Sequence, residues 1–177
     1  KEMQDDSYQY GLINLTTGDV LKNYSTTMNS CSAQFSENDD FFITSGSGNK
    51  LQYFETLRDS NENLWSYEGD SDNGTLNCVS SYIGNRIICE DRYNFFLFSN
   101  QSNIPVWKQT VPPGWSTMGI SISDDGSYFS ILKDTNNPYD LELRNGTNGD
   151  LIWTAEGPFR SQSISPNGEI IIATSHV

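Results

Sequence analysis

Basic residues are scarce in this chain of 177 residues, which has 10 Lys and Arg against 23 Asp and Glu and a formal net charge of −13. Binding to nucleic acid requires clustered Lys and Arg that displace counterions from the phosphates. Here the basic residues are spread singly, so nucleic acid is excluded as a partner. The acidic residues gather in stretches such as SENDD, GDSDNG and SDDGS, which we interpret as solvated turns.

Long apolar runs and catalytic motifs are also missing. No run of about eighteen apolar residues occurs, so we expect no membrane span. The one histidine is His176, and its place next to the C-terminal end gives a Ser-His-Asp or Cys-His arrangement little support. No G-x-S-x-G elbow occurs, and the GSG at 46–48 lies in a turn between strands. We therefore expect a protein that is not an enzyme and holds no cofactor.

Cysteine occurs three times. The stretch NCVSSYIGNRIICE predicts a hairpin that turns at Ile83 and Gly84, which places Cys78 opposite Cys89. A cross-strand disulfide fits this geometry, and two small buried hydrophobic side chains are an equally good interpretation. Cys31 is left over, and no CxxC or Cys/His spacing indicates a metal site.

What the sequence does contain is a repeat. Trp65, Trp107 and Trp153 stand 42 and 46 residues apart in NENLWSYEG, SNIPVWKQT and NGDLIWTAEG. Each repeat also contains an alternating run with a turn, as in GISISDDGSYFSI and QSISPNGEIIIAT. A strand-built repeat of about 43 residues is typical of a β-propeller blade. The equivalent tryptophans then indicate packing between blades rather than a ligand site.

Each repeat reads as four short strands joined by turns. We predict complete blades over residues 31–72, 73–114 and 115–158. Residues 159–177 supply only the first two strands of a fourth blade, and residues 8–28 supply the last two. The alignment of TTGDVLK with TNGDLIW puts Lys22 in the place of the tryptophan. The predicted fold is an all-β propeller with about four four-stranded antiparallel blades, three complete and one split between the termini.

The turns SDDGSY and SPNGEI and the hairpins LFSNQSNIPVWK and LELRNGTNGDLIWT resemble the PQQ-like (quinoprotein-like) and WD-repeat-like propeller repeats over nearly the whole chain. The resemblance implies the fold but not the function, because such propellers serve as enzymes, receptors and scaffolds alike. The chain lacks the Trp-Asp and Gly-His pairs of WD repeats. A PQQ enzyme would need clustered basic residues for its cofactor, but the five arginines from residue 58 onward share no register: Arg58, Arg86, Arg92, Arg144 and Arg160.

Four such repeats are compatible with three arrangements. The chain forms a compact ring of four blades, or a half ring that pairs with a copy of itself to give eight, or a segment of a longer protein. The opening residues Lys1 and Glu2 favour a processed protein or a segment. We favour the segment or the larger assembly.

Several residues are candidates for sites. Asp70, Asp72 and Asn73 resemble the start of a calcium loop, but Gly74 and Ser81 stand where that template needs ligands, so a plain turn is the better interpretation. Trp115 lies outside the tryptophan register, so we expect it to be an exposed contact for a partner. Five Asn-x-Ser/Thr sequons in or near predicted turns are candidate glycosylation sites: Asn14, Asn23, Asn73, Asn100 and Asn145.

The function that these observations favour is a non-catalytic binding or structural module of an exported or cell-surface glycoprotein. Its loops would engage a protein or a glycan, and self-association or a larger assembly is compatible with the repeat. One alternative is a fragment of a quinoprotein-type enzyme. The other is an intracellular WD-repeat-like scaffold, which predicts reduced Cys78 and Cys89 and no glycan.

Overall fold

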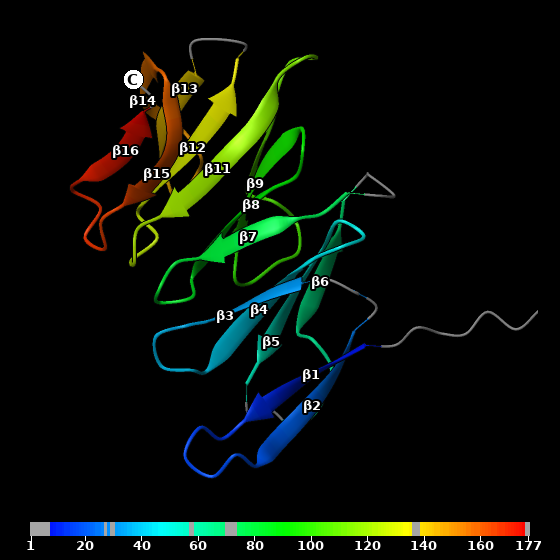
Figure 1. Ribbon diagram of the computed structural model, residues 1–177. Helices are drawn as coiled ribbons and strands as arrows, with labels where there is room; N and C mark the ends of the chain where they lie inside the picture. Colours follow the sequence, from blue (N-terminus) through cyan, green and yellow to red (C-terminus); the bar gives the residue numbers. More distant parts are fainter. Residues whose placement is uncertain are drawn as a thin grey trace, which may run out of the picture.

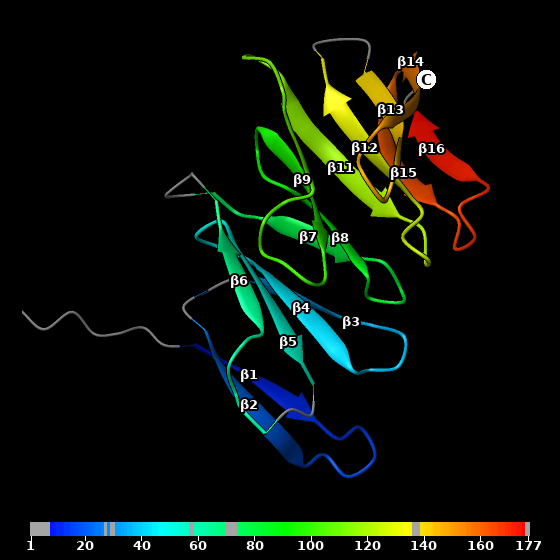
Figure 2. The same cartoon turned by 180° about the vertical axis from the view of Figure 1, so that it is seen from behind.

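Every regular element in the described part of the chain is a β-strand, and all the strands pair antiparallel. The computed structural model describes residues 8–26, 28, 31–56, 59–69, 74–135 and 139–175. Figures 1 and 2 show three four-stranded sheets in a row, with a two-stranded sheet at each end. The predicted all-β class is therefore confirmed.

Within each sheet the strands lie in chain order. The N-terminal hairpin holds β1 (Tyr8–Ile13) and β2 (Val20–Thr26). The next sheet holds β3 (Cys31–Phe35), β4 (Phe41–Gly46), β5 (Lys50–Glu55) and β6 (Trp65–Glu68). It is followed by β7 (Asn77–Ser80), β8 (Arg86–Glu90), β9 (Asn94–Ser99) and β10 (Trp107–Thr110). The third sheet holds β11 (Ser116–Ile122), β12 (Tyr128–Asp134), β13 (Tyr139–Asn145) and β14 (Leu151–Gly157). The C-terminal hairpin holds β15 (Phe159–Ile164) and β16 (Ile171–Ser175).

One turn joins the first two strands of every repeat. A serine opens it, and the serine Oγ accepts the backbone N–H of the residue five positions later at 3.0–3.2 Å. The residue three positions after the serine has a positive φ, which favours glycine. Only the first turn uses another residue there, Asp39, at φ 58°. The four serines are Ser36, Ser81, Ser123 and Ser165.

The N-terminal hairpin has the structure of a third and fourth strand. The third strand faces the tryptophan of the fourth in each complete sheet, and in the hairpin Leu12 faces Lys22 in the same way. The turn that begins at Asn14 also matches the turn at Asn145, because each asparagine carbonyl accepts an N–H from a glycine of positive φ at 2.8 Å. The equivalent pairs in the complete sheets are Tyr53–Trp65, Leu97–Trp107 and Leu143–Trp153.

Successive sheets bury their hydrophobic faces against each other. One core cluster lies between the β3–β6 and β7–β10 sheets and includes Ile43, Ile87 and Phe98. A second lies between the β7–β10 and β11–β14 sheets and includes Leu97 and Phe129. A smaller cluster joins the N-terminal hairpin to its neighbour. Each repeat is therefore stabilised by the next one in the row, as in other repeat architectures.

The two terminal hairpins form separate sheets. The sequence placed residues 159–177 and 8–28 together in one blade, but β15–β16 and β1–β2 pair only within themselves. The reason is visible in Figure 1, where three complete sheets hold the hairpins at opposite ends of the row. The complete sheets lie within the ranges expected for the three complete repeats.

Candidate functional site

The first strands of all four repeats meet around one groove. Its volume is about 260 Å³, and β3, β7, β11 and β15 all contribute to its wall. The lining mixes apolar side chains with hydroxyl, amide and carboxylate groups. The residues are Gln34, Val79, Ser80, Tyr82, Ile120, Ser121, Ile122, Asp124, Ser163 and Ile164.

Hydrogen bonds between side chains and the backbone, instead of bonds between two backbones, connect these first strands. The Gln34 amide accepts the backbone N–H of Ser80 at 2.9 Å and donates to the Ser80 carbonyl at 3.4 Å. The Ser121 Oγ accepts the backbone N–H of Ile164 at 2.9 Å. These bonds link β3 to β7 and β11 to β15.

Two of the serine turns supply Tyr82 and Asp124 to the groove and form its rim, and all four turns are bonded to one another. Glu37 donates its backbone N–H to the Tyr82 carbonyl at 2.6 Å, and Ile83 donates to the Asp124 carbonyl at 3.1 Å. Asp124 in turn donates to the Pro166 carbonyl at 2.9 Å. The four turns are therefore one connected backbone structure.

Two side chains of this rim project into solvent. Tyr82 and Ile83 are each 49% exposed, although they lie beside buried Ser81 and Gly84. An exposed aromatic ring at the rim, beside hydroxyl and amide groups, provides a stacking surface next to hydrogen-bonding groups. Nearby, the hydroxyl and backbone N–H of Ser127 hold the pKa of Asp125 below its usual value, so this carboxylate keeps its charge in mild acid.

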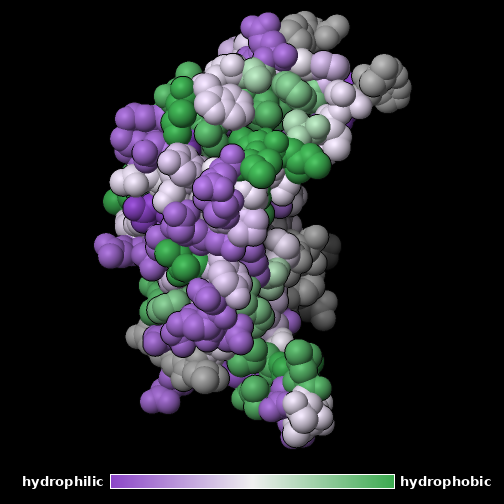
Figure 3. All heavy atoms as spheres, turned by 90° about the vertical axis from the view of Figure 1, so that its left-hand side faces the viewer, coloured by the Kyte–Doolittle hydropathy of each residue, from purple (hydrophilic) through white to green (hydrophobic). Residues whose placement is uncertain are grey.

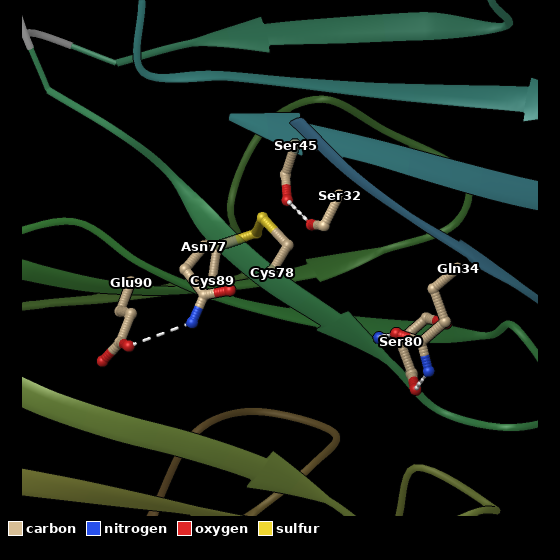
Figure 4. Close-up of a disulfide and its surroundings, with 8 residues drawn as sticks. All are labelled: Ser32, Gln34, Ser45, Asn77, Cys78, Ser80, Cys89 and Glu90. Atoms are coloured by element: carbon tan, nitrogen blue, oxygen red, sulfur yellow. Dashed lines mark hydrogen bonds between the residues drawn. A yellow bond between two sulfur atoms is a disulfide. The ribbon is translucent and has the colours of Figure 1, made fainter. Parts of the chain in front are cut away.

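The predicted cysteine pair forms a disulfide. Cys78 on β7 is bonded to Cys89 on β8, with their Cα atoms 4.1 Å apart. Figure 4 shows the bond beside Ser32 and Ser45, whose hydroxyl oxygens are 3.2 Å apart. Both cysteines are buried in the cluster between two sheets. A disulfide that closes so short a loop stabilises the fold by about 2–4 kcal/mol.

Glu90 follows Cys89 and carries an unfavourable charge. Asn77 donates to its Oε1 at 3.2 Å, while its buried Oε2 has no hydrogen-bond partner. Burial, with a smaller contribution from the Asp91 carboxylate, raises the pKa of Glu90, and the side chains of Asn77 and Thr117 oppose the shift only in part. The folded protein therefore binds this proton more tightly than the unfolded chain. The stability that Glu90 contributes is present below its unfolded pKa and is lost as the pH rises through its folded pKa.

We expect Glu90→Gln to stabilise the protein by about 1 kcal/mol near neutral pH, because an amide avoids the cost of a buried charge. The gain should vanish in acid, where the native carboxyl is already protonated. Urea unfolding at several pH values measures it. Glu62→Gln is the matched control, because the Glu62 side chain is exposed. It should leave the free energy of unfolding unchanged both near neutral pH and in acid. A gain of the same size at every pH would contradict the assignment.

The remaining predicted residues are distributed over the fold. Asn14 and Asn145 occupy the matching turns, and each Oδ1 accepts backbone N–H groups two or three residues later. Asn23 is exposed on β2, and Asn100 lies in the turn after β9. The candidate metal residues Asp70, Asp72 and Asn73 lie outside the described residues, as does His176.

Trp115 is partly buried, and its role as a contact for a partner stays a prediction. Its side chain is partly buried against the cluster between the β7–β10 and β11–β14 sheets. The Lys133 Nζ lies 6.0 Å from the centre of its ring. The reason is that the VPPG connection folds back, with the Trp115 N–H donating to the Pro112 carbonyl at 3.0 Å.

A buried ionic cluster was missed. Glu142 on β13 accepts from the Lys133 Nζ, and Arg144 contacts Glu142 Oε2 through Nε and Nη2 at 2.8 and 2.7 Å. All three residues are at most 9% exposed. The Arg144 guanidinium also lies 4.6 Å from the Trp107 ring centre, so the cluster fills the space between two sheets. The repeat alignment could have revealed the burial of Arg144, because it aligns this residue with Phe98, which lies in the core.

The chain matches no protein-family model, and no curated protein matches it. Within the described residues, no helix has the length and apolar character needed to cross a membrane. No group of three or more His, Cys, Asp or Glu that could hold a metal occurs in that same part of the chain.

Proposed function

We propose that this chain is a segment of a β-propeller and acts as a non-catalytic binding module of an exported or cell-surface protein. The observation that carries the proposal is the convergence of four equivalent first strands on one groove. A propeller places the first strand of every blade at its centre. The groove at 260 Å³ would then be part of a central site.

The chemistry of the groove favours a glycan over a peptide as its ligand. The hydroxyls of Ser121 and Ser163 and the carboxylate of Asp124 suit the hydroxyl groups of a sugar. Tyr82 provides a ring at the rim on which a sugar face can stack. A basic side chain is absent from the lining, so an acidic ligand would find no counter-charge there.

The site can be tested by titrating labelled protein with neutral oligosaccharides and, separately, with short neutral peptides, followed by amide NMR shifts. We expect oligosaccharides to shift the groove amides, and Tyr82→Ala to weaken binding about tenfold through the loss of about 1.4 kcal/mol of stacking. Tyr93→Ala is the matched control, because Tyr93 is 47% exposed in the turn at the opposite end of β8. Equal affinities of the two variants would contradict the groove as the site. Shifts with peptides alone would assign a protein ligand.

The exported location is supported by two features. The Cys78–Cys89 disulfide is typical of oxidising compartments. The sequons at Asn14 and Asn145 lie in surface turns, where a glycan can be accommodated.

Intact mass under non-reducing, denaturing conditions tests the location on protein isolated from its native source. We expect a mass above 19.9 kDa by increments of hexose type, and no labelling of Cys78 or Cys89 by a thiol reagent before reduction. An unmodified mass with both thiols reactive would contradict export and favour an intracellular scaffold.

A further inference from the structure

The two ends of the row expose positions that the complete sheets bury. Ile172 on β16 is 67% exposed, whereas the equivalent residues on β4 and β8, Ile43 and Ile88, are 2% and 0% exposed. Figure 3 shows groups of hydrophobic residues in the upper third and at the lower right of the molecule, with mainly hydrophilic residues between them. The exposed apolar residues at these ends are Ile13, Leu15, Val20, Leu21, Leu151, Ile152, Trp153, Ile170 and Ile172. Both ends therefore lack a covering layer.

The missing layers are complementary. β15–β16 supply the first and second strands of a sheet, and β1–β2 supply the third and fourth, as the turns and the Leu12–Lys22 pair establish. Beside β1 lies an apolar cavity of about 600 Å³, bounded by Leu12, Ile13 and Phe35 and by the turn that contains Asp39. In a complete sheet the second strand pairs with the third. A strand of the β16 type that pairs with β1 would therefore lie beside this cavity.

The edges of β1 and β16 carry no charge. Neither YQYGLI in β1 nor IIATS in β16 contains Asp, Glu, Lys, Arg or Pro. In the complete sheets the fourth strands, which form one edge, carry charges at Glu68, Lys108 and Glu156, whereas the first strands, which form the other edge and line the groove, carry none. Proteins protect a free edge with charges, prolines or short strands. Two uncharged edges in a chain of net charge −13 indicate surfaces that pair with another strand.

Trp153 supplies an independent indication. Trp65 packs on Phe98 of the next sheet, with ring centres 6.0 Å apart, and Trp107 packs on Arg144 of the next sheet at 4.6 Å. Trp153 is the third in this series and is 39% exposed. The N-terminal residue that corresponds to Phe98 and Arg144 is Ile13, which is 51% exposed at the other end of the row.

We propose that a second copy of this chain covers both ends. β16 of one copy pairs antiparallel with β1 of the other, and a two-fold axis repeats the contact. Each copy has three complete sheets, and the two junctions complete two more, so the closed ring contains eight. The β12–β13 register places Ile172 opposite Leu12 of the second copy and Ala173 opposite Gly11. Trp153 of one copy then packs on Ile13 of the other.

Disulfide trapping tests the pairing. The Leu12→Cys and Ile172→Cys variants are made separately in a Cys31→Ser background, mixed and oxidised. We expect a cross-linked species of twice 19.9 kDa in the mixture and in neither variant alone. The variant that carries both cysteines should form a doubly linked dimer. A link within one 19.9 kDa chain would show a ring closed by a single copy, and a ladder of larger species would show an open chain of copies. Either result, or no link, overturns the proposal.

Sedimentation velocity supplies a test without engineered cysteines. We expect the native chain to sediment as a dimer and Ile172→Lys to sediment as a monomer with unchanged circular dichroism. Ile104→Lys is the matched control, since Ile104 is 72% exposed in the connection between β9 and β10, away from both ends. The native dimer should weaken at low salt, because two chains of net charge −13 then repel each other more strongly. A native monomer, or equal behaviour of the two lysine variants, overturns the proposal.

Discussion

Replacement of Trp65 by alanine is expected to lower the free energy of unfolding by about 3–5 kcal/mol. The indole stacks on Tyr53 with ring centres 5.2 Å apart and lies 6.0 Å from Phe98 of the next sheet. Its Nε1 also donates to the Asn100 carbonyl at 2.9 Å. The substitution therefore opens a cavity between two sheets and leaves a carbonyl without its donor. Urea unfolding followed by circular dichroism measures the loss.

The matched control is the same substitution at the exposed end of the row. Trp153 occupies the equivalent position, but the described residues include no third strand of a following sheet for it to pack against within its own chain. In the monomeric Ile172→Lys background, we expect Trp153→Ala to cost about 1 kcal/mol or less. Equal costs at Trp65 and Trp153 would show that packing between sheets does not stabilise this fold.

Replacement of Glu142 by alanine is expected to destabilise the protein by about 3–5 kcal/mol. Glu142 is the only carboxylate within hydrogen-bond distance of both Lys133 and Arg144 among the described residues. Its removal leaves two buried cations, and the 3.9 Å contact of Lys133 with Asp140 compensates only in part. Thermal unfolding and urea titration both measure the effect.

Two further variants separate the ion pair from general damage to β13. Glu156→Ala removes an exposed carboxylate on β14 and should change stability by about 0.5 kcal/mol or less. The triple variant Lys133→Met, Glu142→Leu, Arg144→Met replaces all three charges with apolar side chains and should recover most of the loss, because no charge is left unpaired. A triple variant as unstable as Glu142→Ala would contradict this explanation.

The strands and turns were predictable because their signals are local. Alternation of apolar and polar residues and turns such as SDDGSY depend on neighbours in sequence, and the repeat supplied the same signal several times. The same reasoning placed Cys78 opposite Cys89, since a hairpin determines its own register. It could not decide between a bond and two free thiols, because both fit that register.

The rest depends on contacts between distant segments. The repeat alignment indicates a core position for Arg144, but its burial partners, Trp107 of the preceding sheet and Glu142, follow only from the packing of two sheets. The pairing of residues 159–177 with 8–28 was predicted from strand order alone. Strand order does not show how far each sheet is rotated from the previous one, so it could not show whether the two ends of the row meet. The connection before Trp115 folds back because two sheets pack there. The sequence alone does not show this packing, so Trp115 was expected in solvent.

The interstrand backbone NOEs of labelled protein test whether the two terminal hairpins are the two halves of one repeat. We expect Leu12 to face Lys22 in the same way as Tyr53 faces Trp65, Leu97 faces Trp107 and Leu143 faces Trp153. We also expect Ile172 to face Ser163. A register shifted by one residue in either terminal hairpin would show that the hairpins are not the two halves of one repeat.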